Sequence, residues 1–124
     1  MLVKEIMKRP FVTEKDISLK EAAKIMKDKN IGSLILVSGS KVKGIVTETD
    51  LTRDFGKKER ISQVIKPKVI TIDSDENVDR AVEIMKENKI KRLPVLNNKK
   101  LVGIITSTEI IENFEDLEEE FIFE

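Results

Sequence analysis

The chain repeats itself, and this internal duplication limits its possible folds more than any other feature of the sequence. When the sequence is laid on itself at an offset of 59 residues, residues of the same type recur in register in both halves. Ala22 then falls on Ala81, and Ile25–Lys27 falls on Ile84–Lys86. The other matched pairs are Ile31 and Ile90, Leu34 and Leu93, Lys41 and Lys100, Gly44 and Gly103, Ile45 and Ile104, Thr47 and Thr106, Thr49 and Thr108, and Phe55 and Phe114. We therefore expect two copies of one structural unit.

Each copy opens with a short extended piece and an amphipathic helix. The extended pieces end near Thr13 and Thr71, and the N-cap residues Ser18 and Asn77 follow them. Glu21, three residues after Ser18, completes a capping-box pattern at the first helix start. Apolar residues then recur at the spacing of a helix face, at Leu19, Ala22, Ala23 and Met26 and again at Val78, Ala81, Val82 and Met85.

Two short apolar runs and a second helix complete each copy. The runs are Leu34–Val37 with Lys43–Val46 in the first copy and Leu93–Leu96 with Leu101–Ile105 in the second. The residues between them, Ser38-Gly39-Ser40 and Asn97-Asn98, have the composition of hairpin turns, so each pair of runs predicts two antiparallel strands. Helical patterns resume after Thr47 and after Thr106, with apolar residues at Leu51 and Phe55 and at Ile110, Ile111 and Phe114.

These elements predict an α/β fold, more narrowly α+β, made of two β-α-β-β-α repeats. We assign residues 1–56 to the first repeat, 57–62 to a connection, 63–114 to the second repeat and 115–124 to an acidic C-terminal tail. With 124 residues, two independent domains would each lie near the lower size limit for a hydrophobic core, so we expect the halves to share one. Packing the copies face to face about a pseudo-twofold axis would bury both sheets and create two matching clefts.

Composition excludes several classes of function. Lys and Arg total 23, as do Asp and Glu, so no global positive charge favours a nucleic-acid partner. The chain has no Cys and no His, which removes thiolate metal sites and the commonest general base and argues against an enzyme. Asp73 and Asp75 lie in a turn before a helix, and we assign no metal site. No apolar run approaches the roughly 20 residues that span a bilayer, and no signal-peptide pattern is present, so we expect a soluble cytoplasmic protein.

The most informative motif is Gly44-Ile45-Val46-Thr47-Glu48-Thr49-Asp50, which recurs as Gly103-Ile104-Ile105-Thr106-Ser107-Thr108-Glu109. In each copy, a Thr at the strand-to-helix corner precedes free backbone N–H groups that could hold a phosphate. A carboxylate three residues later is in range of a ribose diol. The same spacing is also an ordinary capping box that needs no ligand, so both interpretations stay open, and a cap can also be shared with a ligand.

The repeated motif, the Ile90–Val95 segment and the duplicated β-α-β-β-α order resemble a tandem pair of CBS (cystathionine β-synthase) domains, a Bateman module, from about Ile6 to Phe114. The resemblance implies a ligand cleft made by both copies, in which Thr holds phosphate, Asp holds ribose hydroxyls and adenine lies among apolar residues. For the first site it implies Gly44, Thr47 and Asp50, with Lys91 within reach of phosphate. The expected neighbours of the base are Val64, Pro67, Val69, Ile70 and Ile90.

A second possible site departs from the family pattern. Glu109 stands where the pattern has Asp, and the extra methylene puts ribose binding there in doubt. Lys91 and Arg92 replace the Gly32 and Ser33 of the first copy, and Arg92 could clamp a phosphate, although a solvated strand edge explains these cations equally well. The residues implied for this site are Arg92, Gly103, Thr106, Glu109, Pro10, Phe11 and Ile31.

The leading functional hypothesis is a non-catalytic regulatory sensor that binds an adenosine nucleotide, such as AMP, ADP or ATP, or a related adenosyl ligand. This nucleotide is a regulatory ligand, and no catalytic cofactor is expected. The alternative is a structural module whose helices after Thr47 and Thr106 pack against a second chain while the clefts stay empty. A homodimer is expected in either case, since Ile110, Ile111 and Phe114 have no obvious cover within one chain. The regulated partner cannot be named from the sequence.

Overall fold

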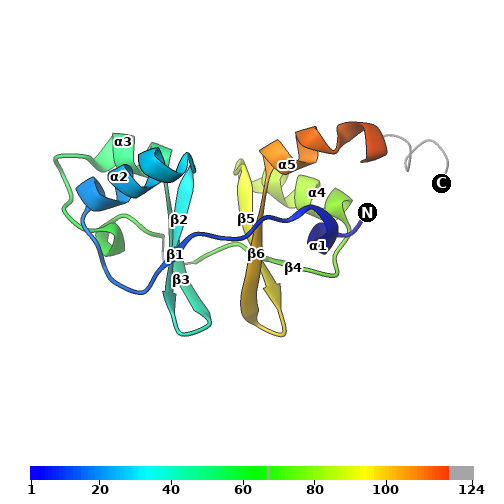
Figure 1. The fold of residues 1–124 in the computed structure, drawn as a ribbon, viewed down its shortest axis with the longest axis horizontal. Helices are drawn as coiled ribbons and strands as arrows, with labels where there is room; N and C mark the ends of the chain where they lie inside the picture. The colour runs from blue at the N-terminus through cyan, green and yellow to red at the C-terminus, as the bar shows by residue number, and fades with distance from the viewer. Residues whose placement is uncertain (67, 118–124) are drawn as a thin grey trace. The chain divides into compact units, whose positions relative to one another are not determined.

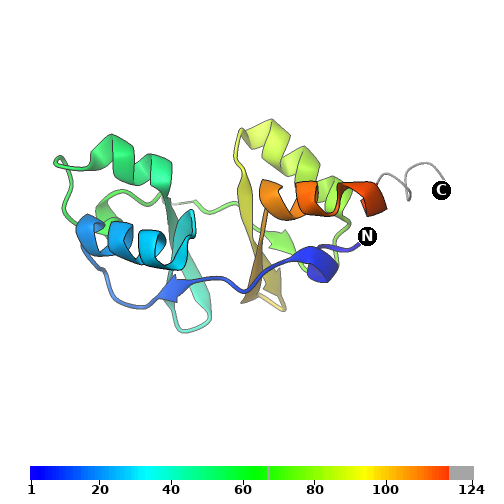
Figure 2. The same ribbon diagram turned by 45° about the horizontal axis from the view of Figure 1, so that its top comes forward.

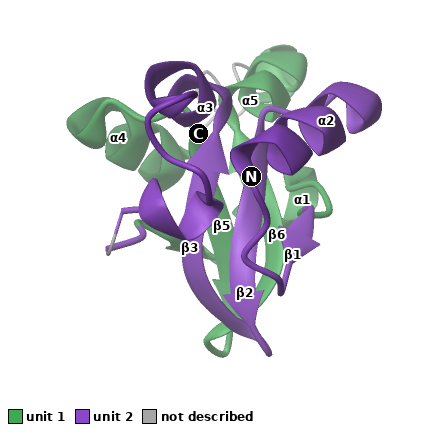
Figure 3. Ribbon diagram, turned by 90° about the vertical axis from the view of Figure 1, so that its left-hand side faces the viewer, with its two compact units in different colours: residues 1–10, 70–124 green, residues 11–69 purple. Residues whose placement is uncertain are grey.

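The computed structural model describes residues 1–66 and 68–117 and divides them into two compact units (Figure 3). Unit 2 is the continuous stretch Phe11–Val69, and unit 1 combines Met1–Pro10 with the chain from Ile70 onward. Each unit contains its own three-stranded sheet. The acidic residues from Glu118 to Glu124 and Pro67 lie outside the described residues.

Unit 2 follows the predicted order and adds one short helix after it (Figure 1). Its sheet has the order β1-β2-β3, with β1 parallel to β2 and β2 antiparallel to β3. The helix α2 connects β1 to β2, as a crossover between parallel strands requires. The elements are β1 (Val12–Thr13), α2 (Leu19–Lys29), β2 (Ser33–Ser38), β3 (Lys41–Thr47), α3 (Glu48–Asp54) and the 3-10 helix η1 (Ile61–Gln63).

Unit 1 repeats this topology and begins with a short helix of its own. Its sheet has the order β4-β5-β6, again with one parallel and one antiparallel pair. The predicted β-α-β-β-α repeat and the mixed fold class are therefore confirmed. The elements are α1 (Val3–Ile6), β4 (Ile72–Asp73), α4 (Val78–Asn88), β5 (Arg92–Asn97), β6 (Lys100–Thr106) and α5 (Ser107–Glu112).

Local sequence sets the ends of the long helices. Ser18 Oγ accepts a hydrogen bond from the N–H of Glu21 at 3.1 Å and so caps α2 as predicted. Asn77 Oδ1 caps α4 by accepting from the N–H of Asp79 at 3.0 Å. Both helices end at a residue in the left-handed region, Asn30 with φ 53° and Lys89 with φ 54°. The two helices therefore stop at equivalent positions of the repeat.

Both hairpins carry a bulge directly before the glycine of the repeated motif. In β3 the pairing register shifts between Leu36 and Val37, which leaves Lys43 without a partner before Gly44. In β6 the same shift leaves Val102 without a partner before Gly103. A bulge bends a strand and increases its twist, so each bulge redirects the strand that leads into the Thr corner.

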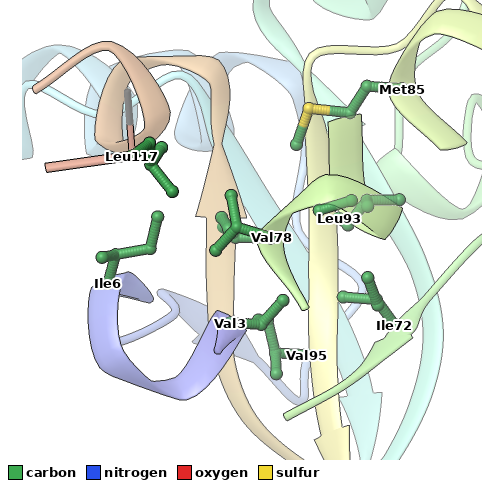
Figure 4. Packing of buried hydrophobic residues seen from close by; sticks show 10 residues of the cluster. Val3, Ile6, Ile72, Val78, Met85, Leu93, Val95 and Leu117 are labelled. Carbon is green, nitrogen blue, oxygen red and sulfur yellow. The ribbon is translucent and has the colours of Figure 1, made fainter. Parts of the chain in front are cut away.

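The helices of each unit cover one face of its own sheet, and each unit has a hydrophobic core in that layer (Figure 2). In unit 2, buried residues of α2, such as Ala22 and Met26, pack with Leu34 and Val46 of the sheet. In unit 1, Met85 of α4 and Leu93 of β5 belong to one cluster (Figure 4), which also contains Ala81 and Ile105. Each unit therefore has a buried cluster of its own among the described residues.

The core of unit 1 is completed by the N-terminal segment of the chain. Val3 and Ile6 of α1 are buried among second-repeat residues such as Val78, as Figure 4 shows. The backbone joins there too, since the N–H of Val3 donates to Glu76 O at 2.8 Å. The compact units therefore differ from the expected boundaries of 1–56 and 63–114, because residues 1–10 pack with the second repeat.

The connection between the repeats packs into unit 2 in the same way. Ile61 is 0% exposed, and its N–H donates to Ile17 O at 3.0 Å. The Ser62 hydroxyl and N–H donate to the two oxygens of Asp16, at 2.5 and 2.9 Å. The hydrogen bond from the Ser62 hydroxyl holds the pKa of Asp16 below its usual value of 3.8. Residues 57–62 are thus a structural part of unit 2 in addition to a connection.

If the connection completes the core of unit 2, truncating its buried side chain should be costly. Ile61→Ala removes a fully buried side chain, so we expect the free energy of unfolding to fall by about 2–5 kcal/mol in urea denaturation. Lys57→Ala, at an exposed position of the same segment, is the matched control and should change stability little. A loss for Ile61→Ala as small as that of the control would contradict the packing role.

The contact between Asp16 and Ser62 should also make stability depend on pH. Because the folded pKa of Asp16 is lowered, its contribution is complete above 3.8 and is lost as pH falls through the lower folded value. The fall in the urea midpoint from about pH 7 to about pH 3 should therefore be smaller for Asp16→Asn than for the wild type. Asp28→Asn, which changes an exposed carboxylate of α2, should keep the wild-type dependence. Equal pH profiles for the wild type and Asp16→Asn would refute the assignment.

Candidate functional site

The first predicted corner lies in unit 2, where β3 ends and α3 begins at Thr47. Thr47 has extended backbone angles and acts as the N-cap of α3. Its N–H and its hydroxyl both donate to Asp50 Oδ2, at 2.9 and 3.1 Å, and its Oγ1 accepts from the N–H of Asp50 at 3.3 Å. The capping-box interpretation is therefore confirmed, and it fixes the Asp50 carboxylate at the corner.

The outer oxygen of Asp50 is held by an arginine of the same helix. Arg53 Nη2 lies 3.1 Å from Asp50 Oδ1 and 2.7 Å from Asp54 Oδ2. The hydrogen bond from Arg53 holds the pKa of Asp54 below its usual value. The Arg53 side chain is 51% exposed and that of Asp50 is 13% exposed. The Asp50 carboxylate is thus partly open to solvent, and its ion-pair partner Arg53 lies at the surface.

The second corner, in unit 1, has the same two hydrogen bonds from Thr to the carboxylate, but this carboxylate is more deeply buried. The N–H and hydroxyl of Thr106 donate to Glu109 Oε1 at 3.0 and 2.9 Å. Thr106 Oγ1 accepts from the N–H of Thr108 at 3.2 Å. Lys8 Nζ lies 3.3 Å from Glu109 Oε2, and the Glu109 residue is only 3% exposed. The longer side chain of Glu109 therefore serves the cap and an ion pair at once.

The two motif glycines accommodate protein side chains. A Cβ on Gly44 would lie 2.7 Å from Ile65 Cβ, and one on Gly103 would lie 2.5 Å from Met7 Sδ. Both distances are shorter than carbon or sulfur atoms tolerate, so each glycine allows another segment of its own unit to cross its strand closely. The space beside each motif glycine is therefore filled by a side chain of the same unit, Ile65 or Met7.

The basic pair of the second copy lies beside the second corner. Arg92 is opposite Thr106 in the β5–β6 register, and Lys91 O accepts from the N–H of Ser107 at 2.9 Å. Arg92 is half-buried and Lys91 is exposed. In unit 2 the equivalent of Arg92 is Ser33, which lies opposite Thr47, so no cation stands at that strand position.

The apolar residues predicted to line the base differ in burial. Val64 is 7% exposed and belongs to the core of unit 2, whereas Phe11 is 42% exposed. Pro67 lies outside the described residues. The half-buried ones are Val69 and Ile31 in unit 2 and Pro10, Ile70 and Ile90 in unit 1. The structure thus brings together Gly44, Thr47 and Asp50 in one unit, and Gly103, Thr106, Glu109 and Arg92 in the other.

Two residues at these corners were missed by the sequence interpretation. Arg53 follows Asp50 at the i,i+3 spacing of a helical ion pair, and this signal could have identified it. Lys8 gave no such signal, because it reaches Glu109 from a distant part of the chain.

The described residues offer no competing metal site or membrane segment. Nowhere in these ranges do three or more His, Cys, Asp or Glu side chains form a group that could hold a metal ion. No helix in the part of the chain that the structure describes is long and apolar enough to cross a membrane. A cavity of about 410 Å³ in unit 2 contains none of the predicted site residues and is lined by Ser18, Leu19, Lys20, Phe55, Gly56, Lys58, Glu59 and Arg60.

Two curated proteins resemble the chain over most of its length. It is 38% identical over 112 residues to a homoserine O-acetyltransferase of Methanosalsum zhilinae, and the match covers 87% of this chain but 23% of that protein. It is 37% identical over 93 residues to the uncharacterized protein YlbB of Bacillus subtilis, covering 69% of this chain and 63% of that protein. The chain therefore spans less than two thirds of either relative.

A solved structure matches the whole fold. The CBS domain pair of protein MJ0100, in complex with 5′-methylthioadenosine and S-adenosyl-L-methionine, superposes with a TM-score of 0.87 at 35% identity. The match covers 94% of this chain and 97% of that one. The family model for the CBS domain matches twice, over residues 3–57 and 61–116. The chain therefore belongs to the CBS domain family and consists of a pair of CBS domains.

Proposed function

We propose that this CBS pair is a non-catalytic regulatory module that binds an adenosine nucleotide or a related adenosyl compound, such as S-adenosylmethionine or 5′-methylthioadenosine. The observation that carries the proposal is the partly exposed carboxylate of Asp50, fixed beside Thr47. The related pair of protein MJ0100, in complex with two adenosyl ligands, supports this ligand class. The acetyltransferase activity of a longer relative is not proposed for this chain, which covers 23% of that protein.

Asp50 is suited to a ribose diol because its carboxylate is already oriented by the cap. Oδ2 is fixed by two hydrogen bonds from Thr47, whereas Oδ1 contacts only the surface side chain of Arg53 among the described residues. A surface ion pair contributes little, so the guanidinium can move aside at small cost when a ligand hydroxyl approaches. The apolar contacts to adenine from Val69, Ile70 and Ile90, and a phosphate contact from Lys91, remain predictions.

Replacing Asp50 tests this proposal, and Asp50→Asn is the sharpest variant because its amide oxygen can still accept the capping hydrogen bonds. Loss of the charge should weaken adenosyl-ligand binding by about 1.5–3 kcal/mol, roughly tenfold or more, in calorimetric titration. Unfolding in urea should show that stability is nearly retained. Arg53→Ala keeps the carboxylate and removes its surface partner, so it should not weaken binding.

Guanosine nucleotides provide the ligand control, since they should raise the melting temperature less than AMP, ATP or S-adenosylmethionine do. Unchanged affinity for Asp50→Asn would remove this residue from the site. The absence of a thermal shift with every adenosyl ligand would favour the structural alternative.

A second candidate function, self-association, is favoured by exposed apolar side chains at the ends of the short helices. Ile111 and Phe114 in unit 1 are 71% and 59% exposed, and Phe55 in unit 2 is 59% exposed. Large apolar side chains on a surface commonly mark a contact with another protein. A homodimer through these helices is compatible with ligand binding.

Light scattering tests self-association directly. The wild type should run as a dimer at micromolar concentration, and Ile111→Glu with Phe114→Glu should shift it toward monomer by placing charges in the contact. Val102→Glu, at a 38% exposed position on β6, is the matched control and should remain a dimer. A monomeric wild type would rule out this candidate.

A further inference from the structure

Lys8 closes over the second corner of unit 1 and is held there by backbone hydrogen bonds. Its N–H donates to Ile104 O at 2.8 Å, and its carbonyl accepts from the N–H of Ile104 at 2.9 Å. The preceding Met7 packs against Gly103. This anchorage places Lys8 Nζ 3.3 Å from Glu109 Oε2 and 3.9 Å from Glu112 Oε2. The cation therefore covers the outer oxygen of the corner carboxylate.

The first corner has no such cover in the described residues. Lys66 follows Ile65 as Lys8 follows Met7, and both lysines are exposed, but among the described residues no ion pair joins Lys66 to Asp50. The shorter Asp50 side chain is paired with Arg53 of its own helix instead. The exposed fraction of the carboxylate side chain is 13% for Asp50 and 4% for Glu109.

These differences make the two carboxylates unequal toward a ligand hydroxyl. At the first corner a half-exposed side chain must rotate, which costs little. At the second corner the Lys8 side chain is itself 56% exposed, so the difference lies in the carboxylate. Glu109 is only 4% exposed, and displacing Lys8 would leave a charge that is nearly excluded from water without its cation. Both carboxylate oxygens of Glu109 are thus engaged, Oε1 by two hydrogen bonds from Thr106 and Oε2 by the ion pair with Lys8.

We propose that Lys8 keeps the Thr106–Glu109 corner closed, so that each chain takes a single adenosyl ligand, at the Thr47–Asp50 corner. Lys8 is then a specificity-determining residue that acts through Glu109 on the number of ligands bound. This inference rests on the proposed function. It also explains the replacement of the family's Asp by Glu at position 109, since the longer side chain reaches Lys8 while its other oxygen remains in the cap.

The amide N–H groups of Thr47 and Thr106 report on the two corners separately in nuclear magnetic resonance spectra, because each donates to the carboxylate of its own corner. With saturating 5′-methylthioadenosine, the Thr47 amide signal of the wild type should shift while that of Thr106 stays in place. In the double variant Lys8→Ala with Glu109→Asp, both signals should shift. Calorimetric stoichiometry should rise from one ligand per chain to two.

Lys4→Ala is the matched control, since Lys4 lies in the same segment but pairs with Asp75 at 2.9 Å. In the Lys4→Ala variant, as in the wild type, the ligand should shift the Thr47 amide signal and leave that of Thr106 in place. A shift of the Thr106 signal in the wild type would overturn the closure, and an unmoved Thr106 signal in the folded double variant would overturn the role of Lys8. If the double variant does not fold, Lys8→Ala alone, which keeps the cap, carries the same comparison. If neither signal moves in the wild type, the proposed function itself fails and the inference fails with it.

Discussion

The fold depends on the burial of two short segments, α1 with Val3 and the connection with Ile61, each against the core of a different repeat. A three-stranded sheet needs a covered apolar face to be stable, and these short segments add to the cover that the helices provide. Val3 and Ile61 are both 0% exposed, so these segments fill the edges of the two cores. Backbone hydrogen bonds from Val3 to Glu76 and from Ile61 to Ile17 fix them in place. The positions of Met7 and Ile65 over the motif glycines follow from this anchorage.

The same anchorage shapes the two Thr corners. Each corner is built by a bulged strand, a glycine crossed by the anchored segment and a capping box. In unit 2 these features leave the Asp50 carboxylate partly open, and in unit 1 the segment also brings Lys8 to Glu109. One repeated sequence motif therefore gives two corners of different chemical character, because the contacts that distinguish them come from residues outside the motif.

Sequence reasoning succeeded where the signals are local. The helices from Leu19 and Val78, the hairpins and the capping boxes at Thr47 and Thr106 all follow from spacing over a few residues. The packing of α1 and η1 could not be predicted, because both are too short for a periodic pattern and their partners are distant in the chain. The contact of Lys8 with Glu109 was missed for the same reason.

Because residues 1–10 pack with the second repeat, the two units can fold at different times during synthesis. Unit 2 is continuous from Phe11 to Val69, so all of its strands and its connection are available once the ribosome has produced that stretch. Unit 1 requires residues 1–10 to meet strands that are synthesised after unit 2, and closing so long a loop carries a larger entropic cost. The half nearer the start of the chain can thus form during synthesis, while the apolar side chains of Val3 and Ile6 must wait for β6 and remain open to chaperones until then.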